Sequence, residues 1–153
     1  LVHKSHPAAF LYIIGEGTQK QKLQELVVKK ALQKHVVFLG KKNHQEVENE
    51  YRMAGVFALS SDQEGCPNVL LEAMSFGIPS VATAVGAVPE IIDDNQSGFV
   101  VPPRDSVSFA QCIIKYIELK DLRERMGLSG REKIKKDFSR EVHGNQLKDI
   151  LGI

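Results

Sequence analysis

The sequence has few cysteines, no long apolar run and almost no net charge. Its 153 residues include two cysteines, Cys66 and Cys112, too few for the disulfide framework of a small secreted domain. No apolar run approaches the roughly 18 to 20 residues that span a bilayer, and no segment resembles a signal peptide. The net charge of +1 gives no general reason to expect nucleic acid or an anionic membrane as a partner. These absences predict a cytoplasmic protein.

Length and composition predict a single globular domain. Apolar residues make up 42% and charged residues 25% of the chain, values that are ordinary for a folded domain. The length is also close to that of a typical domain. The first seven residues, LVHKSHP, begin no recognisable element, so we expect the chain to be a piece of a longer protein.

Short apolar runs alternate with segments of helical periodicity. The runs predict strands at residues 8–14, 35–39, 56–59, 80–83 and 99–101, and the continuous apolarity of the first is typical of a strand buried on both faces. Helices are predicted after Thr18 and Asn43, which can cap them, over residues 68–76, 89–92 and 106–119, and after Asp121 and Ser139. This alternation predicts an α/β fold with one parallel sheet and helices on both faces. Ligands bind beyond the carboxyl ends of the strands in such sheets.

The densest chemical signal follows the third predicted strand. Glu64 lies on a loop before a helix, and Gly65 lets the backbone approach a ligand closely. The first amides of that helix have no internal partner, and the helix dipole favours a phosphate there. Because carboxylates accept hydrogen bonds from hydroxyl groups, Glu64 and Glu72 on either side of a phosphate suit a nucleoside diphosphate sugar. Alternatively, Glu64 only favours the positive helix end and Glu72 faces solvent.

The segment resembles the E-x7-E motif of retaining glycosyltransferases with the GT-B fold, the large group known as group 1 or family 4. Glu64 and Glu72 have the required seven residues between them. The resemblance covers nearly the whole chain, with further similar segments at Ile14 to Gly17, Val37 to Gly40, Glu72 to Met74, Gly77 to Pro79, Gly86, Pro89-Glu90 and Ser97 to Pro102. The resemblance implies that residues 1–153 form a Rossmann-like, three-layer domain, the C-terminal half of a GT-B enzyme.

The resemblance also implies which residues bind the donor. The donor sugar would be bound by Glu64, Gly65, Cys66, Pro67 and Asn68. The nucleotide would be bound by Glu72, Val69, Leu70, Leu39, Gly40, Lys41, Gly15 and Gly17, with Glu72 at the ribose and the backbone near Leu39 at the base. The family needs no metal or cofactor, since the nucleoside diphosphate sugar is a substrate, and no catalytic residue is assigned within this chain.

Two parts of the family pattern lie outside the matching region. These are an Arg and a Lys that neutralise the diphosphate, and the N-terminal domain that binds the acceptor. Without fixed cations much of the stabilisation of the leaving diphosphate is lost, so we expect the chain alone to bind donor weakly and not to transfer sugar. The parent enzyme would glycosylate a glycan, lipid or small molecule, as in polysaccharide biosynthesis, in the cytoplasm or at the inner face of the membrane. Any membrane association would come through that parent.

Several alternatives stay open. The chain is also compatible with a sugar-nucleotide epimerase of the same fold, or with a non-catalytic nucleotide-sugar-binding module. Gly15-Glu16-Gly17 starts a dinucleotide fingerprint, but position 20 is Lys rather than Gly, which favours a plain strand-to-helix turn. Cys66, near a helix start, is either a reactive thiol or a residue that fits the loop.

Overall fold

A computed structural model describes residues 1–138 of the chain. The chain divides into two compact units, unit 1 (Leu1–Glu50) and unit 2 (Tyr51–Ile153), and each is described by itself. None of the described helices combines the length and the apolarity needed to cross a membrane. The helix predicted after Ser139 lies outside the described residues.

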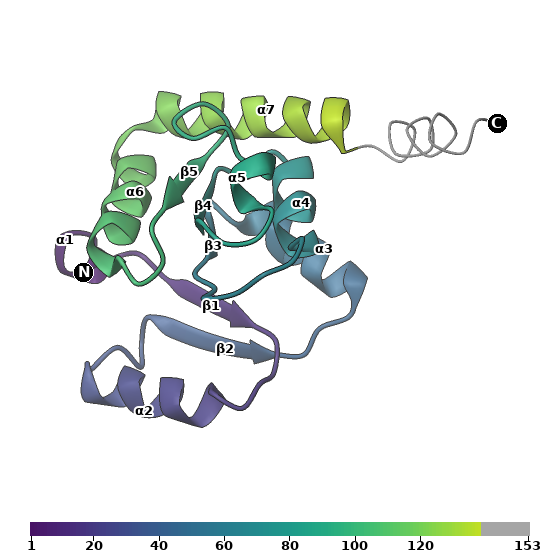
Figure 1. Ribbon diagram of the computed structural model, residues 1–153. Coiled ribbons are helices and arrows are strands. Elements are labelled where there is room, and N and C mark those ends of the chain that lie inside the picture. The colour runs from purple at the N-terminus through teal and green to yellow at the C-terminus, as the bar shows by residue number, and fades with distance from the viewer. Residues whose placement is uncertain (139–153) are drawn as a thin grey trace. The chain divides into compact units, whose positions relative to one another are not determined.

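Unit 1 contains a two-stranded parallel sheet. Strand β1 (Leu11–Ile14) pairs with β2 (Val36–Gly40), and α2 (Lys20–Lys29) connects them (Figure 1). Helix α3 (His44–Met53) starts in this unit with a capping box. The amide of Glu46 donates to Asn43 Oδ1 at 3.0 Å, and the amide of Asn43 donates to Glu46 Oε2 at 2.8 Å. Both orphan amides are satisfied, which confirms Asn43 as the predicted cap.

Two expectations about helix starts in unit 1 are wrong. The first seven residues, which were expected to form no element, contain a single helical turn, α1 (Val2–Ser5). None of its residues is buried. A turn that short has no apolar periodicity to reveal it. Helix α2 has Gln19 rather than Thr18 as its N-cap, and no side chain caps it. The amide of Lys20 donates to the carbonyl of Gly17 at 3.1 Å, so a backbone turn starts this helix instead.

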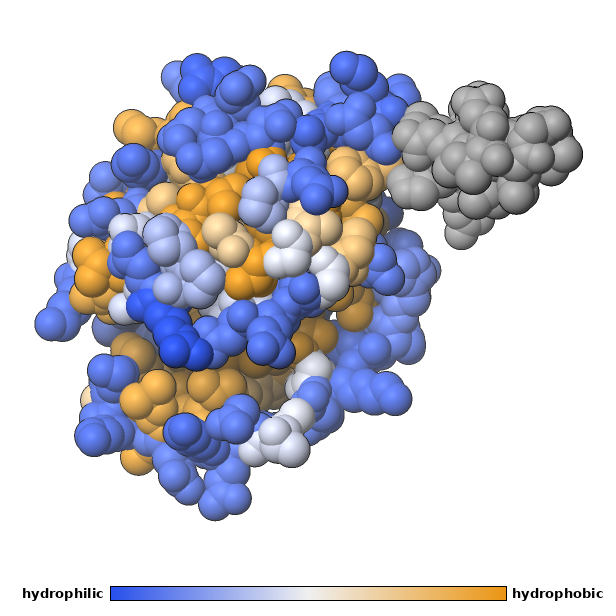
Figure 2. All heavy atoms as spheres, in the orientation of Figure 1, coloured by the Kyte–Doolittle hydropathy of each residue, from blue (hydrophilic) through white to orange (hydrophobic). Residues whose placement is uncertain are grey.

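Strand β1 is exposed, although its continuous apolar run predicted burial on both faces. Leu11 is 49% exposed and Tyr12 is 55% exposed. No described residue of unit 1 falls in the buried class, and Figure 2 shows hydrophobic atoms at its surface. An apolar run identifies a strand that suits burial, but it does not identify an element that covers the strand.

Unit 2 contains a three-stranded parallel sheet in the order β3 (Phe57–Leu59), β4 (Ser80–Thr83) and β5 (Phe99–Val101). Helix α4 (Asn68–Ser75) joins β3 to β4, and α5 (Val88–Ile91) lies between β4 and β5 along the chain. Helices α6 (Ser106–Glu118) and α7 (Lys120–Asp137) follow (Figure 1). The five predicted strands are thus all present and are parallel within each sheet, but their hydrogen bonds form two sheets instead of one. Local sequence patterns identify strands, but they do not determine which strands pair with each other.

The core of unit 2 surrounds β4, whose four residues are all buried. Successive strand residues point to opposite faces, and here they reach two different clusters. Ala82 joins a cluster with Leu70, Met74, Val88, Ile91, Ile92 and Ile134. Val81 joins a cluster with Phe99, Tyr116 and Met126. The sheet therefore has apolar cores on both faces, which gives unit 2 the three layers that the resemblance implies.

Helix α4 ends in a Schellman motif. The amide of Gly77 donates to the carbonyl of Met74 at 2.8 Å, and the amide of Ile78 donates to the carbonyl of Ala73 at 3.2 Å. Gly77 has a φ of 75°, a left-handed conformation that favours glycine. The prediction that Gly77 ends this helix is confirmed.

Candidate functional site

The residues predicted to bind the donor sugar lie on the loop after β3 and at the first turn of α4. Pro67 precedes the helix in an extended conformation, with φ −76° and ψ 97°, and no side chain caps the helix. The amides of Leu70 and Leu71 donate to the carbonyl of Pro67 at 2.9 and 3.4 Å. The start of α4 is therefore open at the carboxyl end of β3.

Several backbone amides at this helix start have no hydrogen-bond partner among the described residues. Within residues 1–138, the amides of Gly65, Cys66, Asn68 and Val69 donate no hydrogen bond to a protein acceptor. Unpaired amides at a helix start, together with the helix dipole, form an anion site. Leu70 differs from these residues, because its amide is occupied by Pro67 and its side chain is fully buried.

The carboxylate of Glu64 is held in one orientation. The hydroxyl of Ser61 donates to Glu64 Oε1 at 2.6 Å, the short distance of a charge-assisted bond. Ser61 is itself held from β4, since Thr83 Oγ1 donates to the carbonyl of Ser61 at 2.6 Å. Glu64 is half-buried, and its second oxygen has no partner among the described residues. That oxygen is available to accept a hydrogen bond from a ligand.

The loop after β4 packs directly against the Glu64 loop. The amide of Ala87 donates to the carbonyl of Gly65 at 2.9 Å. Gly86 has a φ of 53°, and a Cβ atom there would lie 2.5 Å from the carbonyl oxygen of Gly65 and 2.8 Å from the carbonyl carbon of Glu64. Only glycine fits this position without displacing the loop. Gly86 therefore sets how closely the two loops approach each other.

Glu72 lies in the second turn of α4 and contacts a tyrosine from another helix. The hydroxyl of Tyr51, in α3, lies 3.3 Å from Glu72 Oε2 and 3.2 Å from the carbonyl oxygen of Val69. Burial raises the pKa of Tyr51 well above its usual range, and the negative charge of Glu72 raises it further. The phenol therefore stays protonated and acts as a donor.

The predicted nucleotide residues of unit 1 gather at the carboxyl ends of β1 and β2. The amide of Gly15 donates to the carbonyl of Gly40 at 2.8 Å, so the two strand ends are joined by a hydrogen bond. Gly15 and Gly40 have φ values of 114° and 68°, in the range that favours glycine. The remaining predicted residues flank these two glycines: Gly17, Leu39 and Lys41.

Comparison with known proteins decides the family. The sequence profile described as "Glycosyl transferases group 1" matches residues 1–133. The chain belongs to this family. The resemblance based on Glu64, Glu72 and their surroundings is thus confirmed at the level of the family, and the Rossmann-like fold with it.

Three relatives show what this group 1 glycosyltransferase chain is similar to. The putative colanic acid biosynthesis glycosyltransferase WcaL of Escherichia coli (strain K12) is 33% identical over 97% of the chain and 38% of its own length. A GDP-mannose-dependent monoacylated alpha-(1-6)-phosphatidylinositol monomannoside mannosyltransferase of Corynebacterium glutamicum is 30% identical over 96% of the chain and 40% of its own. The crystal structure of the C-terminal domain of a group 1 glycosyl transferase (LpcC) of Francisella tularensis is 28% identical, with a TM-score of 0.84, over 91% of this chain and 74% of that one. The chain thus spans 38% to 40% of these two curated relatives.

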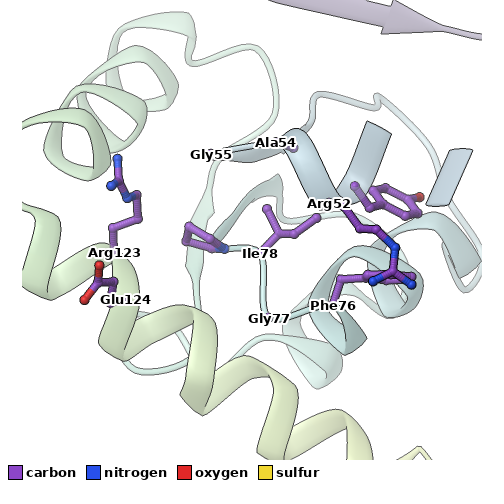
Figure 3. A pocket seen from close by; sticks show the side chains of 10 residues that line it. Arg52, Ala54, Gly55, Phe76, Gly77, Ile78, Arg123 and Glu124 are labelled. Carbon is purple, nitrogen blue, oxygen red and sulfur yellow. The ribbon is translucent and has the colours of Figure 1, made fainter. Parts of the chain in front are cut away.

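Unit 2 also contains a cavity that is lined in part by Tyr51. It has a volume of about 650 Å³ and is lined from the amino ends of β3 and β4 by Gly55, Ile78 and Pro79, and from α7 by Arg123 (Figure 3). The guanidinium of Arg52 lies over the ring of Phe76 at 5.2 Å. Neither Glu64 nor Glu72 lines this cavity. No group of three or more His, Cys, Asp or Glu side chains in residues 1–138 is arranged to hold a metal ion.

The sequence reasoning missed the residues that position the two glutamates. Tyr51 lies one turn after Val47 in α3, a spacing that indicates a core aromatic residue rather than a partner of Glu72. Thr83 is a polar residue at the carboxyl end of a buried strand, and that polarity is the one local signal that marks it. Their contacts with Glu72 and Ser61 span 21 and 22 residues of sequence, and no local pattern encodes such contacts.

Proposed function

We propose that this chain is the donor-binding domain of a retaining glycosyltransferase that uses a nucleoside diphosphate sugar. One observation carries the proposal: along the chain, Glu64 and Glu72 flank unpaired amides at the start of α4. The family match supports it. The name of the C. glutamicum relative, which is GDP-mannose-dependent, supports a nucleotide sugar as the donor.

Each part of the site has a distinct role in this proposal. The amides of Gly65, Cys66, Asn68 and Val69 donate hydrogen bonds to the diphosphate oxygens. The free oxygen of Glu64 accepts hydrogen bonds from hydroxyl groups of the transferred sugar, and Pro67 opens the helix start to them. The carboxylate of Glu72 accepts hydrogen bonds from the ribose hydroxyls. Contacts with the base remain predicted for five residues of unit 1: Gly15, Gly17, Leu39, Gly40 and Lys41.

The helix start alone does not stabilise the leaving group fully. A helix N-terminus carries the equivalent of about half an elementary charge, whereas a departing nucleoside diphosphate gains a full negative charge. We therefore propose that the Arg–Lys pair and the acceptor-binding domain of the family come from the rest of a longer parent chain. In support, the chain spans only 38% of WcaL.

Donor binding is tested on the protein with UDP-glucose, UDP-N-acetylglucosamine, GDP-mannose and ADP-glucose. We expect one of them to shift amide NMR signals of residues 64–72 and to raise the melting temperature, since a ligand at a hundredfold excess over Kd stabilises by about 2.7 kcal/mol. Glu64→Gln should lower affinity for the nucleotide sugar more than for the free nucleotide, and Glu72→Gln should lower both. Glu90→Gln, an exposed change on α5, is the matched control.

Two outcomes would contradict the proposal. The first is the absence of any shift at residues 64–72 with all four donors at millimolar concentration. The second is binding that Glu64→Gln and Glu72→Gln leave as tight as Glu90→Gln does. Retention is tested separately on the longer parent enzyme, by the NMR coupling constant of the anomeric proton in the product. An inverted anomeric configuration would reject the retaining mechanism and leave donor binding intact.

A further inference from the structure

Tyr51 is a buried tyrosine in a helix whose other residues are half-buried or exposed. Its side chain is 6% exposed, and α3 contributes no other buried residue. Its ring packs edge-on against Phe57 at 6.1 Å and tilted against Phe76 at 5.5 Å. A phenylalanine would make the same ring contacts, so packing explains the ring and not the hydroxyl. A buried phenol hydroxyl is retained where it has a hydrogen-bond partner.

The hydroxyl of Tyr51 has one proton and two acceptors within reach. These are the carbonyl oxygen of Val69 at 3.2 Å and Glu72 Oε2 at 3.3 Å. The carbonyl of Val69 lies within α4, where the helical amide four residues later also donates to it. An ionised carboxylate is the stronger acceptor of the two. The proton therefore favours Glu72.

The carboxylate of Glu72 has no other hydrogen-bond or ionic partner in the part of the chain that the structure describes, whereas its backbone carbonyl accepts from Ser75 and Phe76. A glutamate on a helix surface samples several side-chain rotamers, and fixing it loses conformational entropy. The bond from Tyr51 fixes one oxygen, Oε2, and leaves Oε1 free. A carboxylate offers about four acceptor positions, so this arrangement keeps capacity for two more donors, such as a pair of neighbouring hydroxyl groups.

We propose that Tyr51 is the positioning residue for Glu72 and that its hydroxyl holds the carboxylate in the orientation that accepts the 2′- and 3′-hydroxyls of the nucleotide ribose. The inference rests on the proposed function, in which Glu72 binds the ribose. Tyr51 itself touches no substrate. It lowers the entropy lost when Glu72 binds ribose, because the side chain is already ordered before the nucleotide arrives.

The test compares nucleotides with and without the ribose hydroxyls. UDP, GDP and ADP, and the 2′,3′-dideoxy analogue of whichever binds best, are titrated into the protein by NMR. For Tyr51→Phe we expect about fivefold to tenfold weaker binding of the ribonucleotide, the cost of ordering one side chain on binding. The dideoxy analogue should bind the variant and the original protein equally. In a Glu72→Gln background, Tyr51→Phe should have no further effect on ribonucleotide binding.

Tyr116→Phe is the matched control. Tyr116 is also a fully buried tyrosine of unit 2, and its hydroxyl donates to the carbonyl of Ser80 at 3.3 Å. Removing that hydroxyl deletes a buried hydrogen bond without touching Glu72. Both variants keep the aromatic ring, and urea unfolding measures any loss of stability. Tyr116→Phe should leave the ratio of ribonucleotide to dideoxynucleotide affinity unchanged.

The outcomes separate the inference from the proposed function. If Tyr51→Phe weakens both nucleotides equally, or neither, the hydroxyl has only a structural role and the inference is overturned. If the original protein binds the dideoxy analogue as tightly as the ribonucleotide, Glu72 does not bind ribose, and that part of the proposed function fails together with the inference. If it binds no nucleotide, the proposed function as a whole fails.

Discussion

Gly86 provides the sharpest test of how the site is built, because it lies behind the donor loop without belonging to it. In Gly86→Ala the new Cβ atom would lie 2.5 Å from the carbonyl oxygen of Gly65 and 2.8 Å from the carbonyl carbon of Glu64. Both neighbours are backbone atoms, which cannot rotate away as a side chain can. The loop of residues 60–67 must therefore move as a whole.

Two effects add up in this variant. An alanine at the φ of 53° adopts a left-handed conformation that costs about 1 to 2 kcal/mol. Overpacking of a tight contact adds about 1 to 3 kcal/mol. We expect Gly86→Ala to lower the free energy of unfolding by about 2 to 5 kcal/mol. Displacement of Glu64 and Gly65 should also weaken donor binding by about tenfold or more, which corresponds to 1.4 kcal/mol.

Gly77→Ala is a control that isolates the first effect. Gly77 has a φ of 75°, but a Cβ atom there would have no neighbour closer than 3.7 Å, so only the conformational penalty of about 1 to 2 kcal/mol applies. Urea unfolding measures both stabilities, and titration with the best nucleotide sugar measures affinity. Gly77→Ala should leave that affinity unchanged. Equal stabilities of the two variants, or unaltered donor binding by Gly86→Ala, would refute the reasoning.

Three further predictions concern the supports of the fold. Thr83→Val keeps a similar side-chain volume but removes the hydroxyl that donates to the carbonyl of Ser61. It should lower the free energy of unfolding by about 1 to 2 kcal/mol and weaken binding of the nucleotide sugar. An unchanged midpoint of urea unfolding would contradict this. Asp105 caps α6 and accepts hydrogen bonds from Ser108, which lower the pKa of its carboxyl. Its contribution to stability is therefore present above the unfolded pKa and is lost as the pH falls through the folded pKa. Asp105→Ala should lower the free energy of unfolding at pH 7 and lower it less at pH 3, and equal effects at the two pH values would refute this. Amides of unit 1, which has no buried residue among those described, should exchange hydrogen faster than the β4 core of unit 2, and uniform exchange measured by mass spectrometry would show that both units open together.

Local chemistry made most elements of this chain predictable. Asn43 with Glu46 forms a capping box, and Gly77 ends its helix in a left-handed conformation; both signals act within a few residues of sequence. The single turn of α1 and the start of α2 escaped prediction because neither has a side-chain cap at its N-terminus. The pairing of strands escaped it for another reason: apolar runs such as β1 are equally compatible with several neighbours.

The candidate site was predictable only in part for the same reason. The spacing of Glu64 and Glu72 and the glycine and proline between them are local, and they identified the loop and the helix start. The partners that orient the two carboxylates are not local. Ser61 lies close in sequence, but Thr83 and Tyr51 reach the site through tertiary contacts. A motif thus gives the chemical groups, whereas the fold gives their orientation.

The two glutamates are oriented by separate sets of residues, and this separation has a consequence for specificity. Glu64 depends on Gly86 in the loop after β4 and on Thr83 at the end of β4, which acts on Ser61, while Glu72 depends on Tyr51 of α3. Sites without shared partners usually contribute additively. Changes behind Glu64 should therefore alter the preference for one sugar over another at a constant preference for ribose. Changes at Tyr51 should alter the affinity that depends on the ribose hydroxyls and leave the preference among sugars unchanged. The site at the start of α4 can therefore recognise the sugar and the nucleotide independently.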